Sequence, residues 1–388
     1  MKKILLSLVL LSSVATFAQK DELKTLNKIS SKSNISEKDY KSYLDALSSL
    51  KEIATLDADK DEYTFYNSYS PIVHVSSLGQ KINSTVLLQI LNDENYASYL
   101  KIANDSSNPN FEKIRQGNTI LLPLIRDYAF KMNSESNFDN AAFFFYNIYK
   151  LDKKDGQSLE NASILAVQAK NYKMAEKYYR ELYESDYTGS GTFYYATNKM
   201  NQAEEKFSTA RERDIFIKAG SHTMPREEKI LSKKDEYIKA VAMLAAQNGD
   251  IDNAKKAYTE AKKFDIKDVP FLLDEANLYY QSKDYVTYEK LLNDILVFEP
   301  NNVNVNTSLG YAALLPEGKI VEEINASTAP SQRAKYDKLL EERKGLFKKA
   351  LPYFEKAYKF DSENVDIKNI LRTCYEALGM KDKATTIK

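Results

Sequence analysis

Three pairs of residues in this sequence stand 34 positions apart. They are Ala141 and Ala175, Ala254 and Tyr288, and Ala350 and Ala384. A fixed period of this length is typical of a unit of two helices and a turn that stacks on copies of itself. Because such a unit buries its apolar face only against its neighbours, the period predicts a stack of helix pairs rather than one compact core.

The repeat is clearest over residues 235–268. Gly249 suits a turn, and Ala254, Tyr258 and Ala261 then follow at spacings of four and three residues. These spacings place the three side chains on one face of a helix. Small residues let two helices approach closely, while the aromatic ring fills the space to the neighbouring unit. This segment therefore predicts a turn followed by the second helix of a unit.

The same order of aromatic and small residues recurs in other units. It is seen at Phe138, Ala141, Phe145 and Asp152, at Tyr172, Ala175, Tyr179 and Asp186, and at Ala350, Phe354, Ala357 and Asp361. With the pair Leu309-Gly310 in a first helix, the sequence resembles the tetratricopeptide repeat family over about residues 122–188, 235–314 and 345–388. The resemblance implies an all-α fold, a tetratricopeptide-repeat α-solenoid of antiparallel helix pairs.

The period is interrupted between Ala175 and Ala254, where about 45 residues, 187–234, are inserted. β-branched and aromatic residues at 192–198 follow glycines and predict a strand, which residues 204–207 pair with as a hairpin. Ser208 suits the N-cap of a helix that ends near Lys218, and an extended segment follows from His222. The insertion is therefore expected to be a small hairpin plus a helix.

A second insertion, of about 28 residues, precedes Ala350. We expect a turn at 316–318, a polar loop at 325–330 and a long helix over 332–349, with Pro352 bending it or standing near its start. Nearer the N-terminus, helices are expected at 62–78 and 86–103, interrupted by Pro71 and Pro109.

The chain is thus divided into a signal peptide (1–18), an atypical N-terminal helical region with a degenerate repeat (19–117), repeat units (118–188), the first insertion (189–234) and further repeats (235–388) that carry a loop and helix insertion at about 315–345.

The first 18 residues have the features of a signal peptide. Lys2 and Lys3 precede an apolar run at 4–11, and Ala18 supplies a small residue for cleavage, so Gln19 is the expected first residue of the mature chain. The apolar run is too short to span a bilayer. We therefore expect an exported protein, periplasmic or secreted, without membrane insertion.

Charge excludes a general attraction to nucleic acid. The chain has 55 basic and 55 acidic residues, and removal of two lysines with the signal peptide leaves a net charge of about −2. We expect no nucleic-acid partner.

Residues suited to catalysis or metal binding are few. The two histidines, His74 and His222, stand in no zinc-binding spacing. Cys374, the one cysteine, lies among apolar residues and is expected to be buried. We expect no cofactor, no metal and no enzyme activity. An enzyme would need His222, which lies near Arg211, Arg213 and Arg226 in the sequence, to be held beside a carboxylate or nucleophile.

The resemblance also implies a binding surface, because first helices line the concave face of such a solenoid and usually bind ligands through the second, fifth, ninth and twelfth positions of the unit. Asparagine can hydrogen-bond a peptide backbone, and tyrosine offers contact area. The basic set that grips chaperone C-termini is missing. The candidate residues are Lys239, Met243, Asn277, Tyr280, Asn304, Thr307 and Tyr311.

These observations favour a non-catalytic, exported scaffold that binds a protein or peptide in the bacterial envelope. The run Tyr194–Asn198 resembles insertions in exported repeat proteins of the Bacteroidetes. The alternative is a small-molecule or glycan binding protein with a pocket at the 187–234 insertion, and a more remote one is an enzyme.

Overall fold

The computed structural model describes residues 20–54 and 57–387. The predicted signal peptide and Gln19 lie outside the described residues. The described chain forms two compact units, one up to Tyr237 and one from Ile238. Within these ranges, every helix is too short or too polar to pass through a bilayer.

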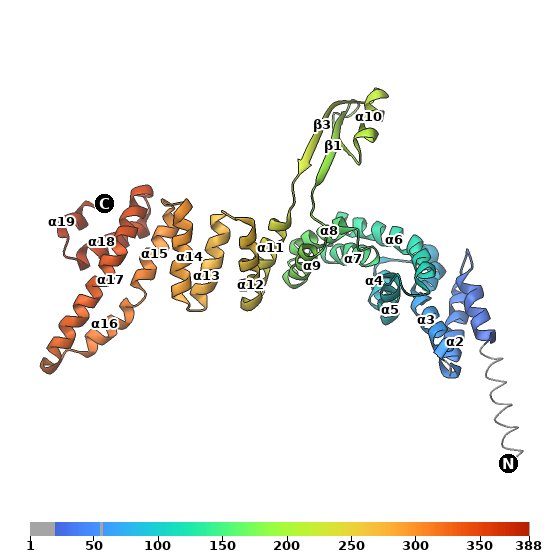
Figure 1. Cartoon of the computed structure of the whole chain (residues 1–388), viewed down its shortest axis with the longest axis horizontal. Coiled ribbons are helices and arrows are strands. Elements are labelled where there is room, and N and C mark those ends of the chain that lie inside the picture. Colours follow the sequence, from blue (N-terminus) through green and yellow to red (C-terminus); the bar gives the residue numbers. More distant parts are fainter. Residues whose placement is uncertain (1–19, 55–56, 388) are drawn as a thin grey trace, which may run out of the picture. The chain divides into compact units, whose positions relative to one another are not determined.

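The first unit is built mainly of consecutive helices (Figure 1). Residues 20–30 are helical. The helices that follow are α2 (Glu37–Ile53), α3 (Asp57–Leu78), α4 (Ser84–Asn92), α5 (Glu94–Ala103), α6 (Phe111–Ser134), α7 (Phe138–Leu151), α8 (Gly156–Gln168) and α9 (Tyr172–Glu184). Sequential helices pack against one another, as stacked helix pairs require.

The second unit repeats this pattern. Its helices are α11 (Lys234–Gln247), which begins in the first unit, α12 (Ile251–Ala261), α13 (Val269–Gln281), α14 (Tyr285–Phe298), α15 (Val303–Leu314), α16 (Glu317–Ala326), α17 (Arg333–Phe360), α18 (Val365–Ala377) and α19 (Lys381–Thr386). The fold is the predicted all-α tetratricopeptide-repeat solenoid with a small mixed insertion.

A recurring turn explains the 34-residue period. The N-caps Asn137 and Asn171 are 34 residues apart, as are Asp250 and Asp284, and each side chain accepts a hydrogen bond from the backbone N–H three residues on. The residue before each cap has a positive φ, between 58° and 76°. Only Gly249 among these four is a glycine, so the turn is largely invisible to a search for glycine.

Close helix contacts account for the small residues of the repeat. Ala254, Tyr258 and Ala261 are all buried, which confirms their predicted common face. At Gly310, an added Cβ would lie 2.5 Å from the ring of Phe354, so only glycine lets α15 approach α17 this closely. Cys374 is completely buried, as predicted, and burial raises the pKa of its thiol to about 12.

Prolines interrupt the helices less than the sequence predicted. Pro71 lies inside α3 without ending it, whereas Pro352 lies inside α17, which is one of its two expected placements. A proline in a helix leaves the carbonyl four residues earlier without its usual donor, a cost that packing can outweigh. The turn expected at 316–318 lies slightly earlier, at 315–316, because α16 begins at Glu317 with Pro316 as its N-cap.

The helix expected at 86–103 is two helices, since Asn83 caps α4 and Asp93 caps α5.

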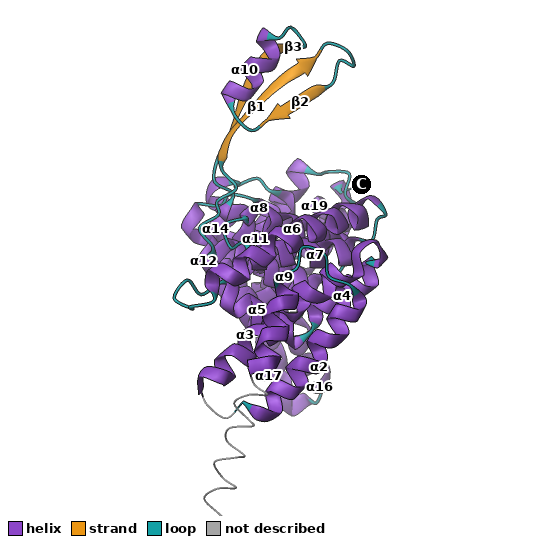
Figure 2. Ribbon diagram, turned by 90° about the vertical axis from the view of Figure 1, so that its right-hand side faces the viewer, coloured by secondary structure: helices purple, strands orange, loops and turns teal. Residues whose placement is uncertain are grey.

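The first insertion is a three-stranded antiparallel sheet with one helix. Its elements are β1 (Gly191–Asn198), β2 (Glu204–Phe207), α10 (Ala210–Lys218) and β3 (His222–Ile230), and the strand order is β2-β1-β3. Figure 2 shows α10 lying against the sheet. Thr209, not Ser208 as predicted, caps α10. The extended segment after His222 is a full strand that pairs with β1, although its charged sequence shows no apolar alternation.

Candidate functional site

The exposed side of α11, α13 and α15 in the second unit carries most of the predicted binding residues. We call it the first-helix face. Met243 on α11, Tyr280 on α13 and Tyr311 on α15 are each between 44% and 47% exposed, and Asn277 and Asn304 are exposed beside them in the sequence. Large half-exposed side chains at repeated positions supply contact area that packing within the unit does not use.

A hollow of about 320 Å³ lies on this face between α11, α12 and α13. We call it the amide hollow, because three side-chain amides and one carboxylate line it together with a tyrosine and a methionine. These residues are Gln247, Asn277, Gln281, Asp274, Tyr258 and Met243, with Ala246 and Leu278.

The amide hollow contains a polar group without a partner. Tyr258 is 1% exposed, and its buried hydroxyl has no hydrogen-bond partner among the described residues. A buried, unsatisfied hydroxyl costs stability unless something binds it. Burial, followed by the charge of Asp268, raises the pKa of Asp274 in the same hollow. The hollow is therefore lined by polar side chains, and the buried hydroxyl of Tyr258 beside it has no partner among the described residues.

A second hollow, of about 500 Å³, lies between α13, α14 and α15. We call it the tyrosine hollow, because Tyr280, Tyr288 and Tyr311 line it with Ser308 and several aliphatic residues. The ring centroids of Tyr280 and Tyr288 lie 5.2 Å apart, and Tyr311 packs edge-on against Phe354, also at 5.2 Å. Aromatic contacts thus hold these rings in place around the opening.

The remaining predicted residues are placed differently. Lys239 is engaged within the unit, since its ammonium lies 2.7 Å from the Asp268 carboxylate and above the Phe271 ring. Asn304 and Thr307 line neither hollow, and the Thr307 hydroxyl is buried without a partner among the described residues. The structure therefore brings Met243 and Asn277 into one hollow and Tyr280 and Tyr311 into the other.

Sequence reasoning missed several lining residues of these hollows, among them two tyrosines. Tyr258 and Tyr288 occupy the slots of the repeat that pack between helices. This packing position did not indicate that they also line the hollows. A hydroxyl at the end of a core ring is the available signal, because a buried tyrosine normally finds a partner for it.

In the insertion, His222 is the centre of a closed cluster. Its Nε2 lies 2.8 Å from Glu205 Oε2 and its Nδ1 lies 2.9 Å from Ser221 Oγ. The ring is 4% exposed and packs against Phe207 and Phe216. Serine, histidine and glutamate in contact resemble the order of a nucleophilic triad. The geometry of Ser221 decides whether the cluster is such a triad or a structural contact.

Ser221 is poorly placed to be a nucleophile. Its hydroxyl also contacts the carbonyl of Phe216, at 3.0 Å, in the last turn of α10. The C-terminus of a helix is its negative end, which disfavours the oxyanion that acyl transfer would form. The cluster is therefore a structural contact between β2, β3 and α10.

The arginines near this cluster are mostly paired. Arg226 lies between Glu204 and Glu228 and over the ring of Tyr195. Arg213 is buried and pairs with Asp214 and Glu227. Arg211 is exposed. Over residues 20–54 and 57–387, no three His, Cys, Asp or Glu side chains are grouped as a metal ion would need.

The base of the insertion is fixed by a buried carboxylate. Glu160 on α8 is 6% exposed, and it accepts hydrogen bonds from the hydroxyls of Tyr187 and Tyr237 and pairs with Lys233. Beside it, the Lys234 ammonium binds carbonyls at the C-terminal end of α9. These contacts join the two ends of the insertion to α8 and α9.

Comparison with known proteins gives no closer identification. No family model matches the chain, and no curated protein matches it. The human IFIT1 dimer with m7Gppp-AAAA is 15% identical over 95% of this chain and 71% of that chain, with a TM-score of 0.27. A tetratricopeptide repeat protein from Parabacteroides merdae is 11% identical over 92% and 98%, with a TM-score of 0.26, and the P58(IPK) TPR domain is 13% identical over 94% and 99%, also at 0.26. Similarities of this size carry no information about ligands, so the fold rests on the helix pairs and turns described above.

Proposed function

We propose that this chain is a non-catalytic scaffold that binds a protein or peptide in extended conformation through the first-helix face. The observation that carries the proposal is the pair of hollows on one face, one of which holds the unpartnered Tyr258 hydroxyl. Concave sites with a few converging polar groups are where proteins bind ligands.

The spacing of the hollows suits an extended peptide. Asn277 lines the amide hollow, and Tyr280, three residues later on α13, lines the tyrosine hollow. Three residues of helix span about 4.5 Å along the axis, and one residue of extended chain spans about 3.3 Å. Neighbouring residues of one peptide can therefore place a backbone amide in the first hollow and a side chain in the second.

The lining residues also define the chemistry of the peptide. No lysine or arginine lines either hollow, and Lys239 is paired with Asp268. A carboxylate would therefore find no cation there, and Asp274 would repel it. We expect the peptide to offer free backbone N–H and C=O groups and an apolar or aromatic side chain for the tyrosine hollow.

The proposed setting is the bacterial envelope, after cleavage following Ala18. The support is the sequence of residues 1–18, which lie outside the described residues. N-terminal sequencing of the protein from the soluble envelope fraction should find Gln19. Recovery of the chain from the cytosol with Met1 intact would contradict export.

Selection of random peptides displayed on phage, with the chain from Gln19 as bait, tests the binding face. Selected peptides should bind the double variant Tyr280→Ala/Tyr311→Ala more than about tenfold more weakly, a loss of roughly 1.4 kcal/mol. The matched control is Val286→Ala/Val297→Ala, which truncates two side chains on α14 that are 84% exposed and line neither hollow.

His222→Ala should leave peptide binding intact. If instead His222→Ala abolishes binding and the tyrosine variant does not, the insertion is the working site and the proposal is wrong.

A further inference from the structure

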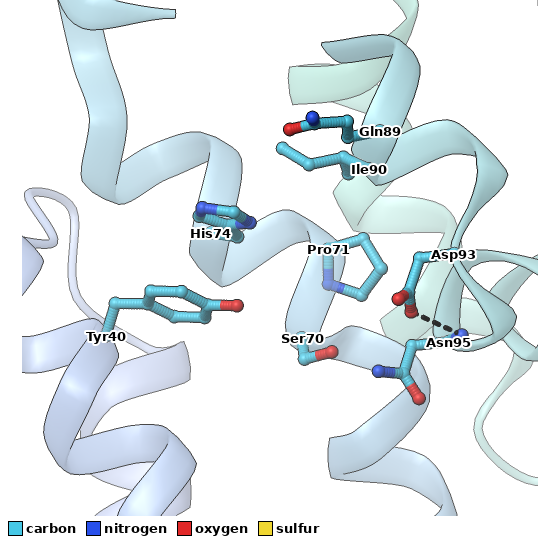
Figure 3. A pocket seen from close by; sticks show the side chains of 8 residues that line it. All are labelled: Tyr40, Ser70, Pro71, His74, Gln89, Ile90, Asp93 and Asn95. Carbon is cyan, nitrogen blue, oxygen red and sulfur yellow. Dashed lines mark hydrogen bonds between the residues drawn. The ribbon is translucent and has the colours of Figure 1, made fainter. Parts of the chain in front are cut away.

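A separate hollow in the first unit lies between α2, α3 and the junction of α4 with α5. Its volume is about 210 Å³ (Figure 3). We call it the Ser70 hollow. Its lining residues are Tyr40, Ser70, Pro71, His74, Gln89, Ile90, Asp93 and Asn95.

Ser70 supplies a buried polar group that faces this hollow. The residue is 4% exposed, and its hydroxyl has no hydrogen-bond partner in the described part of the chain. Ser68, two residues earlier on α3, is also buried without a partner but does not line the hollow. The protein therefore leaves the Ser70 hydroxyl free at a place that a small ligand can reach.

Asn95 presents its N–H₂ group to the hollow. Its Oδ1 accepts a hydrogen bond of 2.5 Å from Asn67 Nδ2, which fixes the orientation of the amide. Figure 3 shows the nitrogen of Asn95 directed toward Ser70 and the hydroxyl of Tyr40 directed into the same space. Hydrogen-bond donors thus converge from three helices.

The hollow also has an acceptor side. Asp93 makes no ion pair with any described residue, and of its two oxygens only Oδ1 is engaged, by the backbone N–H of Asn95. No lysine or arginine lines the hollow. The ring of His74 stacks on Tyr40 with centroids 4.4 Å apart, and burial lowers the pKa of His74, which favours the uncharged ring.

We infer that the Ser70 hollow binds a small hydroxylated molecule of the size of a monosaccharide. An anion would meet the Asp93 carboxylate with no cation to offset it, and an ammonium ion would meet the N–H₂ group of Asn95. A hydroxyl group donates and accepts, so it satisfies both sides at once. Pro71 and Ile90 offer an apolar surface to the C–H groups of a ring.

The size of the hollow agrees with this class of ligand. A cavity of about 150 Å³ holds benzene, and this hollow is larger at about 210 Å³, which leaves room for hydroxyl groups around a six-membered ring. The site is independent of the first-helix face, because it is built from other helices in the other unit.

Saturation-transfer NMR on the chain from Gln19 tests the inference. The probes are D-glucose, D-galactose, D-mannose and N-acetyl-D-glucosamine, with putrescine as a cationic probe. At least one sugar should give signals, and putrescine should not compete with it. Ser70→Ala and Tyr40→Phe should each weaken binding of that sugar about tenfold, roughly 1.4 kcal/mol.

Ser68→Ala is the matched control, since it removes a buried hydroxyl without a partner from the same helix, outside the hollow. It should leave sugar binding unchanged, as should Tyr280→Ala/Tyr311→Ala. The inference is overturned if none of the four sugars binds, if putrescine displaces the sugar, or if Ser70→Ala and Ser68→Ala have the same effect while both variants keep the wild-type unfolding temperature.

Discussion

The insertion and the first-helix face differ in how they use their polar groups. In the insertion, His222 contacts Glu205 and Ser221, and Arg226 lies between two glutamates. On the first-helix face, the Tyr258 hydroxyl has no partner among the described residues, and amides line an open hollow. The insertion satisfies the polar groups of this cluster internally, whereas the first-helix face leaves some of its polar groups without a partner.

This difference shows why residue type alone is a poor guide to a binding site. A histidine beside a serine and a glutamate attracts a catalytic interpretation, yet here the three hold a small sheet to its helix. Free hydrogen-bonding capacity at an accessible surface is the more useful observation, because buried polar groups in folded proteins are normally satisfied. Four predictions test the comparison.

The largest expected effect is that of His222→Ala. The substitution removes a ring that is 4% exposed, with its contacts to Phe207 and Phe216 and to Glu205. We expect a loss of about 2–4 kcal/mol in the local stability of the insertion. Hydrogen exchange at the amides of β1 and β3 would measure it, with Met200→Ala, at a side chain 96% exposed, as the control. Unchanged protection would show that the cluster does not hold the sheet.

Overpacking beneath the first-helix face should have the next largest effect. Ala254 is completely buried on α12, which packs against α13, so Ala254→Leu should cost on the order of 1–3 kcal/mol of unfolding free energy. Peptide binding should weaken as well, because α13 carries Asn277 and Tyr280. Chemical denaturation measures the first effect and peptide titration the second.

The control for this substitution is Lys256→Ala, at an exposed position, which should change stability by less than about 0.5 kcal/mol. Its neighbour Lys255 would be a poorer control. Lys255 is half-buried, with its ammonium 4.5 Å from the centroid of the Tyr279 ring. Equal denaturation midpoints for Ala254→Leu and Lys256→Ala would refute the assigned helix face.

A pair of tyrosine variants compares a satisfied hydroxyl with an unsatisfied one. The hydroxyl of Tyr237 donates to Glu160, so Tyr237→Phe should destabilise the chain by about 1–2 kcal/mol. Tyr258→Phe removes a hydroxyl without a partner and should change stability by less than about 0.5 kcal/mol, or raise it slightly. Thermal unfolding of both variants measures the difference. A comparable loss for Tyr258→Phe would mean that its hydroxyl is already satisfied.

The smallest effects are pH-dependent and opposite in sign for two carboxyls. Hydrogen bonds from His222 and then Asn198 hold the pKa of Glu205 below its usual 4.5. Its contribution to stability is therefore present above pH 4.5 and is lost as the pH falls through the lower folded pKa. Burial, and then Asp268, raise the pKa of Asp274 above 3.8, so its ionisation lowers stability as the pH rises through the raised value.

Denaturation of Glu205→Gln and Asp274→Asn over a series of pH values distinguishes these signs. Glu205→Gln should be less stable than the parent chain at neutral pH and equal to it in acid, whereas Asp274→Asn should be more stable at neutral pH. If both variants lose stability at neutral pH, Asp274 has a partner and the amide hollow is not a site of unused polar groups.

Local sequence determined what could be predicted of this fold. The spacing of Ala254, Tyr258 and Ala261 identified a helix face, and the glycines and aromatic residues before Asn198 identified a strand. β3 was recognised only at its start, because its pairing with β1 is between residues far apart in the sequence. Pro71 was expected to interrupt a helix because local propensity ignores the packing that keeps α3 continuous.

The candidate site shows the same limit. The repeat register brought Met243, Asn277, Tyr280 and Tyr311 to the hollows, because repeat position determines which side of a helix a residue occupies. It also selected Lys239, whose ion pair with Asp268 depends on the approach of two helices. The sequence showed a tyrosine at position 258 in a core slot, but not that its hydroxyl lacks a partner, since a missing hydrogen bond is a property of the assembled structure.

The two ends of the insertion meet, because the backbone N–H of Lys233 donates to the carbonyl of Thr188 over 2.8 Å. The 44 residues between Thr188 and Lys233 therefore act as a short connection between α9 and α11, whatever those residues fold into. The closure entropy of such a loop grows only slowly with its length, so its content can change at little cost to the repeats. This position is thus a natural place for an exchangeable cassette, where a different folded segment could be grafted while the Glu160 anchor is kept.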